Sequence, residues 1–248
     1  MTGHINVDLK SAVLGHVLGL PITNSLLMTW LVMAILIIFA FFFGRSLKMV
    51  PGKFQASVEW MISGGMDYVS ETFENASLAK RFFPLLATIF LFIAVSNELE
   101  FVPGVGSIGF FQNGVLTPLL RAPAADLNFT LALAIICFLT IEITGIVSLG
   151  ILKYGGKFVN FKSPIGFAVG IIELISNLGR LISFSFRLFG NIFAGEVLIL
   201  VASFFMPYLL PVPLMAFEMF VGVVQAVVFA MLTMFFIKLA VMEPHEEH

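Results

Sequence analysis

Long apolar runs without charges recur along the chain and predict helices that cross a membrane. They lie at about 24–43, 82–102, 127–152, 164–206 and 214–242. The first contains LLMTWLVMAILIIFAFFF, eighteen residues with no charge, which is long enough to span a bilayer as a helix. The pattern predicts an all-α integral membrane protein in which residues 1–248 form a single membrane domain. It would have an N-terminal transmembrane helix, a membrane hairpin and two long C-terminal helices.

A further predicted helix, over about 54–75, is amphipathic. Its apolar side is formed by Val58, Met61, Ile62, Gly65, Val69 and Phe73, and its polar side by Gln55, Glu59, Ser63, Asp67, Ser70 and Glu74. A helix with so much polar surface does not cross a bilayer, but it can lie on one with its apolar side in the headgroup region. We expect it on the cytoplasmic surface of the membrane, with Trp60 as an interfacial anchor.

Basic residues follow the first and third apolar runs and predict the orientation of the chain. The two groups are Arg45, Lys48 and Lys53, and Lys153, Lys157 and Lys162. Short loops rich in Lys and Arg stay on the cytoplasmic side, whereas the segment 103–125 has one basic residue, Arg121. The N-terminus is therefore expected outside and the C-terminus in the cytoplasm.

The run 164–206 is too long for an ordinary transmembrane helix. No proline interrupts it between Pro164 and Pro207. As one helix it would be roughly 60 Å long, twice the roughly 30 Å thickness of the hydrocarbon core. It must be steeply inclined, extend far out of the membrane, or break. Because its polar residues lie in the membrane-length part, we favour steep inclination for this helix and its successor.

Composition agrees with a membrane protein and narrows the chemistry. Of 248 residues, 59% are hydrophobic and 11% are charged, whereas soluble domains are roughly a quarter charged. The net charge of −2 gives no basic field for nucleic acid. The single cysteine, Cys137, can form no internal disulfide. The chain has no phosphate-binding GxxxxGK[ST] loop, HExxH motif or catalytic triad pattern, so we expect no catalytic site of its own, no cofactor and no metal.

One face of the predicted helix 164–206 is polar. At 100° per residue, five side chains fall within about 40° of Arg187: they are Glu173, Ser176, Arg180, Ser183 and Asn191. Glu196 falls on the opposite face. On the next helix Glu218 and Gln225 share a face, and Gly222 between them would allow close approach of a neighbour.

Charged groups at membrane depth are costly and usually functional. Arg187 cannot lose its proton, so it needs a counter-ion or water. A purely structural ion pair with Glu173 or Glu196 is one alternative. No carboxylate lies three or four residues from Arg187, however, which favours a partner on another chain. Glu196 and Glu218 are candidate proton relay sites. The alternative is that each is a buried, protonated acid bonded to the backbone.

The same residues resemble a known family. SFRLFGNIFAGE at 185–196 is similar to the signature of the membrane-embedded a subunit of F-type ATP synthases. VPGKFQ at 50–55, SNELEFVPG at 96–104, APAADLNFTLALA at 122–134 and the Gln225-Ala226 pair match other blocks of that family in order. The resemblance implies a subunit beside a rotating ring of c subunits, with two aqueous half-channels that load and unload the ring carboxylates.

The resemblance also implies roles for individual residues. Arg187 matches the essential arginine, which attracts the ring carboxylate and blocks proton leakage. The residues that match proton-path or supporting positions are Asn191, Glu196, Glu218, Gln225, Glu173, Arg180, Ser183, Asn97 and Glu100. Some relatives pair a Glu with a His where this chain has Glu196 and Glu218, and two nearby carboxylates would titrate as a coupled pair.

The family further implies partners and a location. The expected partners are the c-ring, b-type peripheral stalk subunits, the remaining ATP synthase subunits and the lipid bilayer, and the expected location is a bacterial plasma membrane. Two other classes remain open. A secondary transporter would show a repeat with a midplane substrate site, and the chain shows no repeat. A structural scaffold would leave the polar face unexplained.

Overall fold

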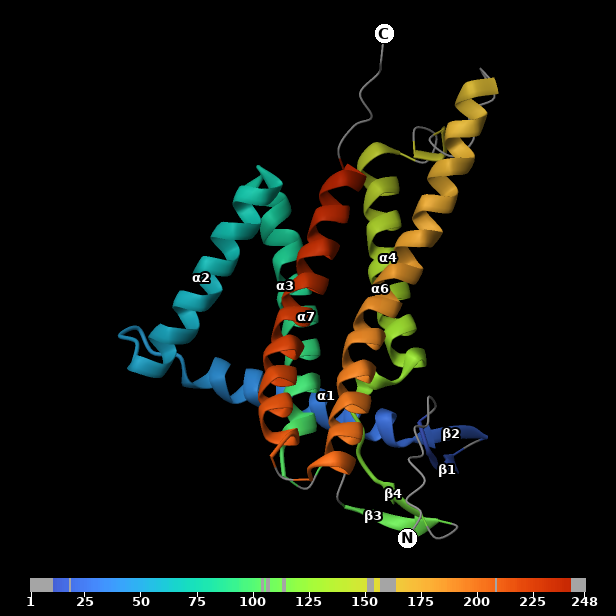
Figure 1. Ribbon diagram of the computed structural model, residues 1–248. Coiled ribbons are helices and arrows are strands. Elements are labelled where there is room, and N and C mark those ends of the chain that lie inside the picture. Colours follow the sequence, from blue (N-terminus) through green and yellow to red (C-terminus); the bar gives the residue numbers. More distant parts are fainter. Residues whose placement is uncertain are drawn as a thin grey trace.

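The computed structural model describes residues 11–17, 19–103, 105, 108–112, 115–150, 154–156, 164–207 and 209–241 (Figure 1). Its long helices are α1 (Asn24–Ser46), α2 (Lys53–Phe73), α3 (Ala76–Glu98), α4 (Leu127–Leu149), α6 (Pro164–Phe205) and α7 (Pro211–Val241). All but α2 are long and apolar enough to cross a membrane. The chain is therefore an all-α integral membrane protein, as its apolar runs predict.

Short elements gather at one end of the helices, near the turn between α6 and α7 (Figure 1). Two antiparallel hairpins are formed by β1 (Val13–Val17) with β2 (Leu20–Thr23) and by β3 (Gly109–Gln112) with β4 (Val115–Pro118). The 3-10 helices η1 (Leu99–Phe101) and η2 (Pro123–Ala125) follow α3 and precede α4. Strands of four or five residues give no clear periodic signal, so neither hairpin follows from the hydrophobic pattern. We call this end of the molecule the hairpin end.

Capping residues, rather than the limits of the apolar runs, set where helices begin. α3 begins at Ala76 instead of near residue 82, because the Asn75 side chain accepts hydrogen bonds from the backbone N–H groups of Ser77 and Leu78. α4 ends at Leu149, followed by Gly150 at a φ of 83°, a conformation that glycine adopts without strain. The predicted helix ends at 151–152 and 242, and the basic cluster Lys153, Lys157 and Lys162, lie outside the described residues.

The long segment that follows is one unbroken helix. α6 contains 42 residues, which corresponds to a length of roughly 63 Å. A break, one of the three alternatives left open by its length, is therefore wrong. Figure 1 shows α6 running obliquely across α4 and extending beyond it, away from the hairpin end.

The core lies between α3, α4, α6 and α7. Ile93, Cys137, Leu188 and Phe229, one from each helix, are at most 1% exposed and belong to one cluster. The rings of Phe184 and Phe229 meet edge to face with centroids 4.9 Å apart, a favourable aromatic geometry. This packing fixes α6 and α7 against the hairpin formed by α3 and α4.

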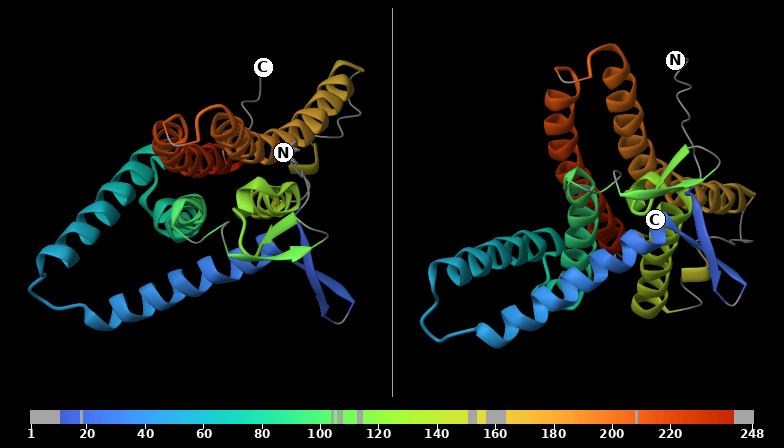
Figure 2. Two further views of the ribbon diagram at one scale, coloured as in Figure 1. Left: turned by 60° about the horizontal axis from the view of Figure 1, so that its bottom comes forward. Right: turned by 90° about the horizontal axis from the view of Figure 1, so that it is seen from below.

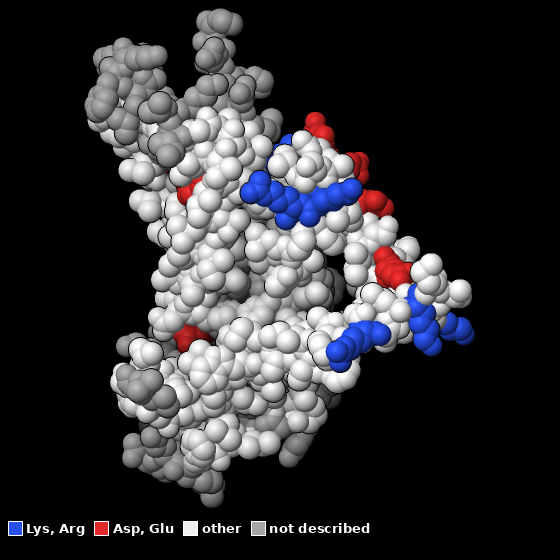
Figure 3. All heavy atoms as spheres, turned by 180° about the vertical axis from the view of Figure 1, so that it is seen from behind, with Lys and Arg blue, Asp and Glu red and all other residues white. Residues whose placement is uncertain are grey.

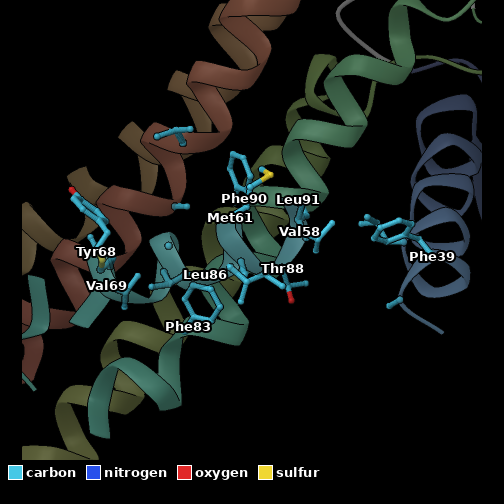
Figure 4. Close-up of a pocket in the computed structure, with 18 of the residues that line it drawn as sticks. Phe39, Val58, Met61, Tyr68, Val69, Phe83, Leu86, Thr88, Phe90 and Leu91 are labelled. Carbon is cyan, nitrogen blue, oxygen red and sulfur yellow. The ribbon is translucent and has the colours of Figure 1, made fainter. Parts of the chain in front are cut away.

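Many apolar side chains point away from this core, as expected of helices in lipid. On α1, for example, Ile37 is 67% exposed and Phe42 is 65% exposed. A groove of about 840 Å³ lies between α1, α2, α3 and α7. Figure 4 shows Phe39 of α1 facing Val58 and Leu91 across this groove. Its lining is almost entirely apolar, so the groove belongs to the lipid-facing part of the molecule.

The amphipathic helix lies at the periphery. Figure 2 shows α1 and α2 as the two arms of a V that opens towards the bundle. Of the predicted apolar side of α2, Val69 and Phe73 are buried against the chain, whereas Met61 and Ile62 are exposed and line the groove. In Figure 3, Lys, Arg, Asp and Glu gather over α2 and the adjoining ends of α1 and α3. This distribution agrees with a helix at a membrane surface.

At the far end of α7, Lys238 donates to the Glu74 carboxylate at 2.7 Å. Glu74 follows α2 and has a positive φ of 54°. The hydrogen bond and positive charge of Lys238 lower the pKa of the exposed Glu74 carboxyl. The ion pair therefore forms at neutral pH and links the α2–α3 turn to α7.

Near the hairpin end, Asp126 joins three parts of the chain. Its side chain caps α4 through the Asn128 N–H at 2.9 Å and accepts hydrogen bonds from Ser11 at 2.5 Å and Ser25 at 2.7 Å. Asp126 is 4% exposed, so these three donors replace water around its charge. The N-terminal segment and α1 are thereby attached to the start of α4.

We expect Asp126→Ala to lower the free energy of unfolding by about 2–4 kcal/mol, because it removes a helix cap and two hydrogen bonds to a charged group. Thermal denaturation in detergent micelles, followed by circular dichroism, measures the loss. Asn128→Ala is the matched control, since Asn128 is exposed and contributes only its backbone to this network. Equal melting temperatures for the two variants would contradict the prediction.

Candidate functional site

Arg187 lies on an exposed face of α6, near the middle of that helix. Its guanidinium donates to the Ser183 hydroxyl at 3.3 Å. Within the described part of the chain, no carboxylate lies within 4.0 Å of it. The alternative of a structural ion pair with Glu173 or Glu196 is therefore wrong for this chain.

The core-facing side of α6 fixes this face in place. Phe184 and Leu188 are buried in the core, and the Ser185 hydroxyl is hydrogen-bonded to the Thr130 hydroxyl of α4 at 3.1 Å. Helical geometry then turns Ser183, Arg187 and Asn191 away from α4. We call these three side chains, together with Gln225 of α7, the Arg187 face.

Asn191 and Gln225 connect the two long helices beside Arg187. The Asn191 amide nitrogen donates to the Gln225 side-chain oxygen at 2.6 Å. Asn191 is exposed and Gln225 is buried, with no hydrogen-bond partner for its amide nitrogen among the described residues. Because Asn191 lies one helical turn from Arg187, this bond fixes the spacing of α6 and α7 at the position of the guanidinium.

A second polar group lies nearer the hairpin end. It consists of Asn97, Glu100, Arg121, Glu196 and Glu218, and we call it the hairpin-end cluster. Arg121 forms an ion pair with Glu196 at 2.9 Å, and the two side chains are only 12% and 34% exposed. Glu100 is close enough to Arg121, Glu196 and Glu218 to interact with them electrostatically. The chain thus gathers three carboxylates and one guanidinium here.

Two glycines make room for this cluster. A Cβ on Gly195 would collide with the Glu218 carboxyl group, and one on Gly222 would be 3.0 Å from Cβ of Asn97. Asn97 donates to the Gly222 carbonyl at 3.1 Å. The expectation that Gly222 allows close approach is therefore correct, and the neighbour is α3.

Six of the expected site residues do not belong to the hairpin-end cluster, among them Arg187, Asn191 and Gln225 of the Arg187 face. Ser183 belongs to the Arg187 face, while Arg180 and Glu173 lie further towards the other end of α6. The Arg180 guanidinium lies 5.0 Å from the centroid of the Phe236 ring, and Glu173 is half-buried. The polar residues of α6 thus divide into two groups along the helix, one on either side of Arg187.

Sequence reasoning missed three polar residues. Arg121 stands out in the sequence only as the one basic residue of 103–125, and no sequence signal places it beside Glu196, 75 residues away. Asn177 is 5% exposed on α6, and no sequence signal marks it.

The third residue is Tyr154, whose hydroxyl donates a hydrogen bond to the Glu142 carboxylate at 2.9 Å. Burial, and then this hydrogen bond and the charge of Glu142, raise the pKa of Tyr154 far above its usual value.

No group of three or more His, Cys, Asp or Glu residues that could hold a metal ion occurs in the described ranges. The arrangement can instead move protons. Carboxylates, amides and hydroxyls exchange or relay protons, and a fixed guanidinium attracts a mobile anion.

The family model described as ATP synthase A chain matches residues 26–238. The chain belongs to this family. ATP synthase subunit a of Geotalea daltonii is 36% identical over 225 residues, which cover 90% of this chain and 89% of that protein. The subunit a of Desulfotalea psychrophila is 38% identical over 213 residues, covering 83% and 79%, and that of Helicobacter hepaticus is 33% identical over 223 residues, covering 89% and 90%.

Membership of the ATP synthase A chain family, together with five helices of membrane length, shows what class of protein this is and which complex it belongs to. It is a multi-pass membrane protein and part of an F-type ATP synthase complex. Its functions are those of the family, proton transport and ATP synthesis. The resemblance expected from the SFRLFGNIFAGE block is confirmed.

We expect Gly195→Ala to destabilise the protein by about 1–3 kcal/mol, because the new methyl group would occupy the place of the Glu218 carboxyl and force α6 and α7 apart. Adding Glu218→Ala should restore much of this loss by vacating the space. Thermal denaturation in micelles compares the variants. Gly44→Ala on α1, where a Cβ meets open space, is the control, and a Gly195→Ala melting temperature equal to it would refute the steric argument.

Proposed function

We propose that this chain is the stator side of the proton path in a rotary ATP synthase. In this proposal it forms two aqueous half-channels that load and unload carboxylates on a ring of c subunits, and so couples proton flow to rotation of the ring. The observation that carries the proposal is the exposed Arg187 guanidinium. It belongs to an ATP synthase A chain, and it has no carboxylate partner among the described residues of its own chain.

Arg187 acts in this proposal as a fixed cation facing the ring. A deprotonated ring carboxylate is drawn to it, because an unpaired charge at membrane depth is costly for both groups. A protonated ring carboxyl has no such attraction and moves on into lipid. The positive charge also repels protons that would pass directly from one half-channel to the other. The Asn191–Gln225 hydrogen bond keeps the guanidinium at one distance from α7 and from the ring.

The two polar groups along α6 would serve the two half-channels. The hairpin-end cluster lines the path from the outer side, and Ser183, Arg180 and Glu173 line the path to the cytoplasm. Glu196 is nine residues from Arg187, a separation of roughly 14 Å along the helix axis. Since Glu173 lies fourteen residues from Arg187 in the other direction, the two groups reach different depths of the membrane.

The proposed placement in the membrane follows from length and charge. We propose that α6 and α7 are steeply inclined along the ring, since an unbroken helix of about 63 Å exceeds the bilayer thickness. The basic residues Arg45, Lys48 and Lys53 support a cytoplasmic α2, an outer N-terminus and a cytoplasmic C-terminus. The relatives are bacterial, which supports the plasma membrane, with b-type stalk subunits as further partners.

Arg187→Ala in the assembled complex should abolish ATP synthesis driven by a proton gradient, because the ring carboxylate loses its attracting cation and protons leak between half-channels. Arg187→Lys should retain little activity, because a compact ammonium cannot reproduce the guanidinium geometry. Synthesis is measured in reconstituted vesicles. Arg45→Ala is the control, since Arg45 is an exposed arginine that stacks on Phe41, away from the Arg187 face. Normal synthesis by Arg187→Ala would reject the proposed role.

Purification distinguishes this proposal from a secondary transporter. A tagged copy of the chain, extracted in mild detergent, should co-purify with an oligomeric c-ring and the other ATP synthase subunits. A chain that purifies alone and transports a solute in vesicles would favour the transporter instead.

A further inference from the structure

The ion pair between Arg121 and Glu196 distinguishes the acids of the hairpin-end cluster from one another. The charged residues of the cluster are Glu100 of η1, Arg121 before η2, Glu196 of α6 and Glu218 of α7, and Glu98 ends α3 two residues before Glu100. Among the described residues, Arg121 lies within ion-pair distance of Glu196 but not of the other three. The acids of this end are thus not equivalent.

Glu196 is poorly suited to carrying a proton. The Arg121 guanidinium is permanently charged and offers only donors, so the Glu196 oxygen 2.9 Å away must accept. Protonating Glu196 would break this charge-assisted bond in a site where Arg121 is 12% exposed. Breaking a buried ion pair by neutralising one partner is strongly unfavourable, because the other charge stays buried.

Glu218 is in the opposite situation. Its side chain is buried over Gly195, the residue next to Glu196. No cation lies within 4.0 Å of it, and its Oε1 has no hydrogen-bond partner, in the parts of the chain that are described. A proton can therefore be added to Glu218 or removed from it without breaking an ion pair.

We propose that Arg121 is a positioning residue that holds Glu196 as a permanent anion, so that the exchangeable proton of the hairpin-end half-channel resides on Glu218. This inference rests on the proposed function. A water-borne proton adds to the Glu218 carboxylate and gives the acid. The acid then releases the proton towards the ring carboxylate and returns to the carboxylate form, while Glu196 stays ionised throughout. Glu218 thus carries the proton and Glu196 stays an anion, so that the two do not share one proton as a coupled pair.

The test is ATP-driven proton pumping by intact complexes in vesicles. Arg121→Gln and Glu196→Gln should each slow pumping by about tenfold or more, because each removes one charge of the ion pair and leaves the other in a mostly buried site. The double variant Arg121→Gln with Glu196→Gln should recover to within about threefold of wild type, because no charge is stranded. Glu218→Gln should abolish pumping. Arg121→Lys, which keeps a cation, should pump faster than Arg121→Gln.

The pH profile of pumping separates positioning from proton transfer. The double variant should keep the wild-type midpoint, since Glu218 still carries the proton. A double variant no faster than Glu196→Gln, or one with a displaced midpoint, would overturn the inference and make Glu196 a proton carrier. The matched control is Glu74→Gln with Lys238→Gln, which removes an ion pair at the other end of α7 and should pump normally.

Assembly is checked on native gels. If a single variant fails to assemble, an assembled and active double variant supports the ion pair directly, whereas a double variant that is unassembled or inactive overturns the inference. Failure of the proposed function has a different signature: Arg187→Ala would then pump normally, whatever the hairpin-end variants do. Normal pumping by Glu218→Gln, with Arg187→Ala inactive, would refute only the division of roles between the two glutamates.

Discussion

The charge on which the proposed function depends is the Arg187 guanidinium, which has no carboxylate partner among the described residues. Arg187 cannot be deprotonated, and within the described residues its side chain bonds only to a hydroxyl. A guanidinium at membrane depth costs a few kcal/mol by insertion scales and more by simulation. The chain nevertheless holds Arg187 firmly, through the buried Phe184 and Leu188 and the Thr130–Ser185 bond behind it. This rigid placement of a charge supports the proposal that its counter-ion comes from a neighbouring subunit.

The hairpin-end cluster differs from the Arg187 face because it contains an ion pair. Arg121 is paired within the chain, and the pair is mostly buried. In the proposed division of roles, the Arg121 cation stays with Glu196 and is not available to a moving carboxylate of the ring. Glycines at 195 and 222 bring α6, α7 and α3 close enough for Glu218 and Asn97 to lie beside that pair. In the proposed function, the Arg121–Glu196 ion pair, Glu218, which has no cation within 4.0 Å among the described residues, and Arg187 further along α6 mark successive points of the proton path.

The sequence predicted most of the helices, because uncharged runs of this length have few alternatives in a folded protein. It also predicted the polar face of α6, since helical periodicity alone aligns Ser183, Arg187 and Asn191. It placed the start of α3 six residues too late, because the run begins after Arg81 whereas the helix begins at the Asn75 cap. It could not find the Arg121–Glu196 pair, whose partners are 75 residues apart. Contacts between distant segments depend on packing, which no local pattern records.

The unbroken length of α6 explains why one helix can carry both polar groups. Arg187 lies near its middle, Glu196 towards the hairpin end, and Arg180 and Glu173 towards the other end. A helix that matched the bilayer would place one of these groups outside the membrane. In the proposed inclined placement, the longer helix keeps all of them at membrane depth in a fixed order, and its backbone hydrogen bonds remain internal, as lipid requires. A break near Arg187 would expose unpaired backbone groups and release the guanidinium from the core that fixes it. The order and depth of the charged residues along α6 therefore depend on the helix being unbroken.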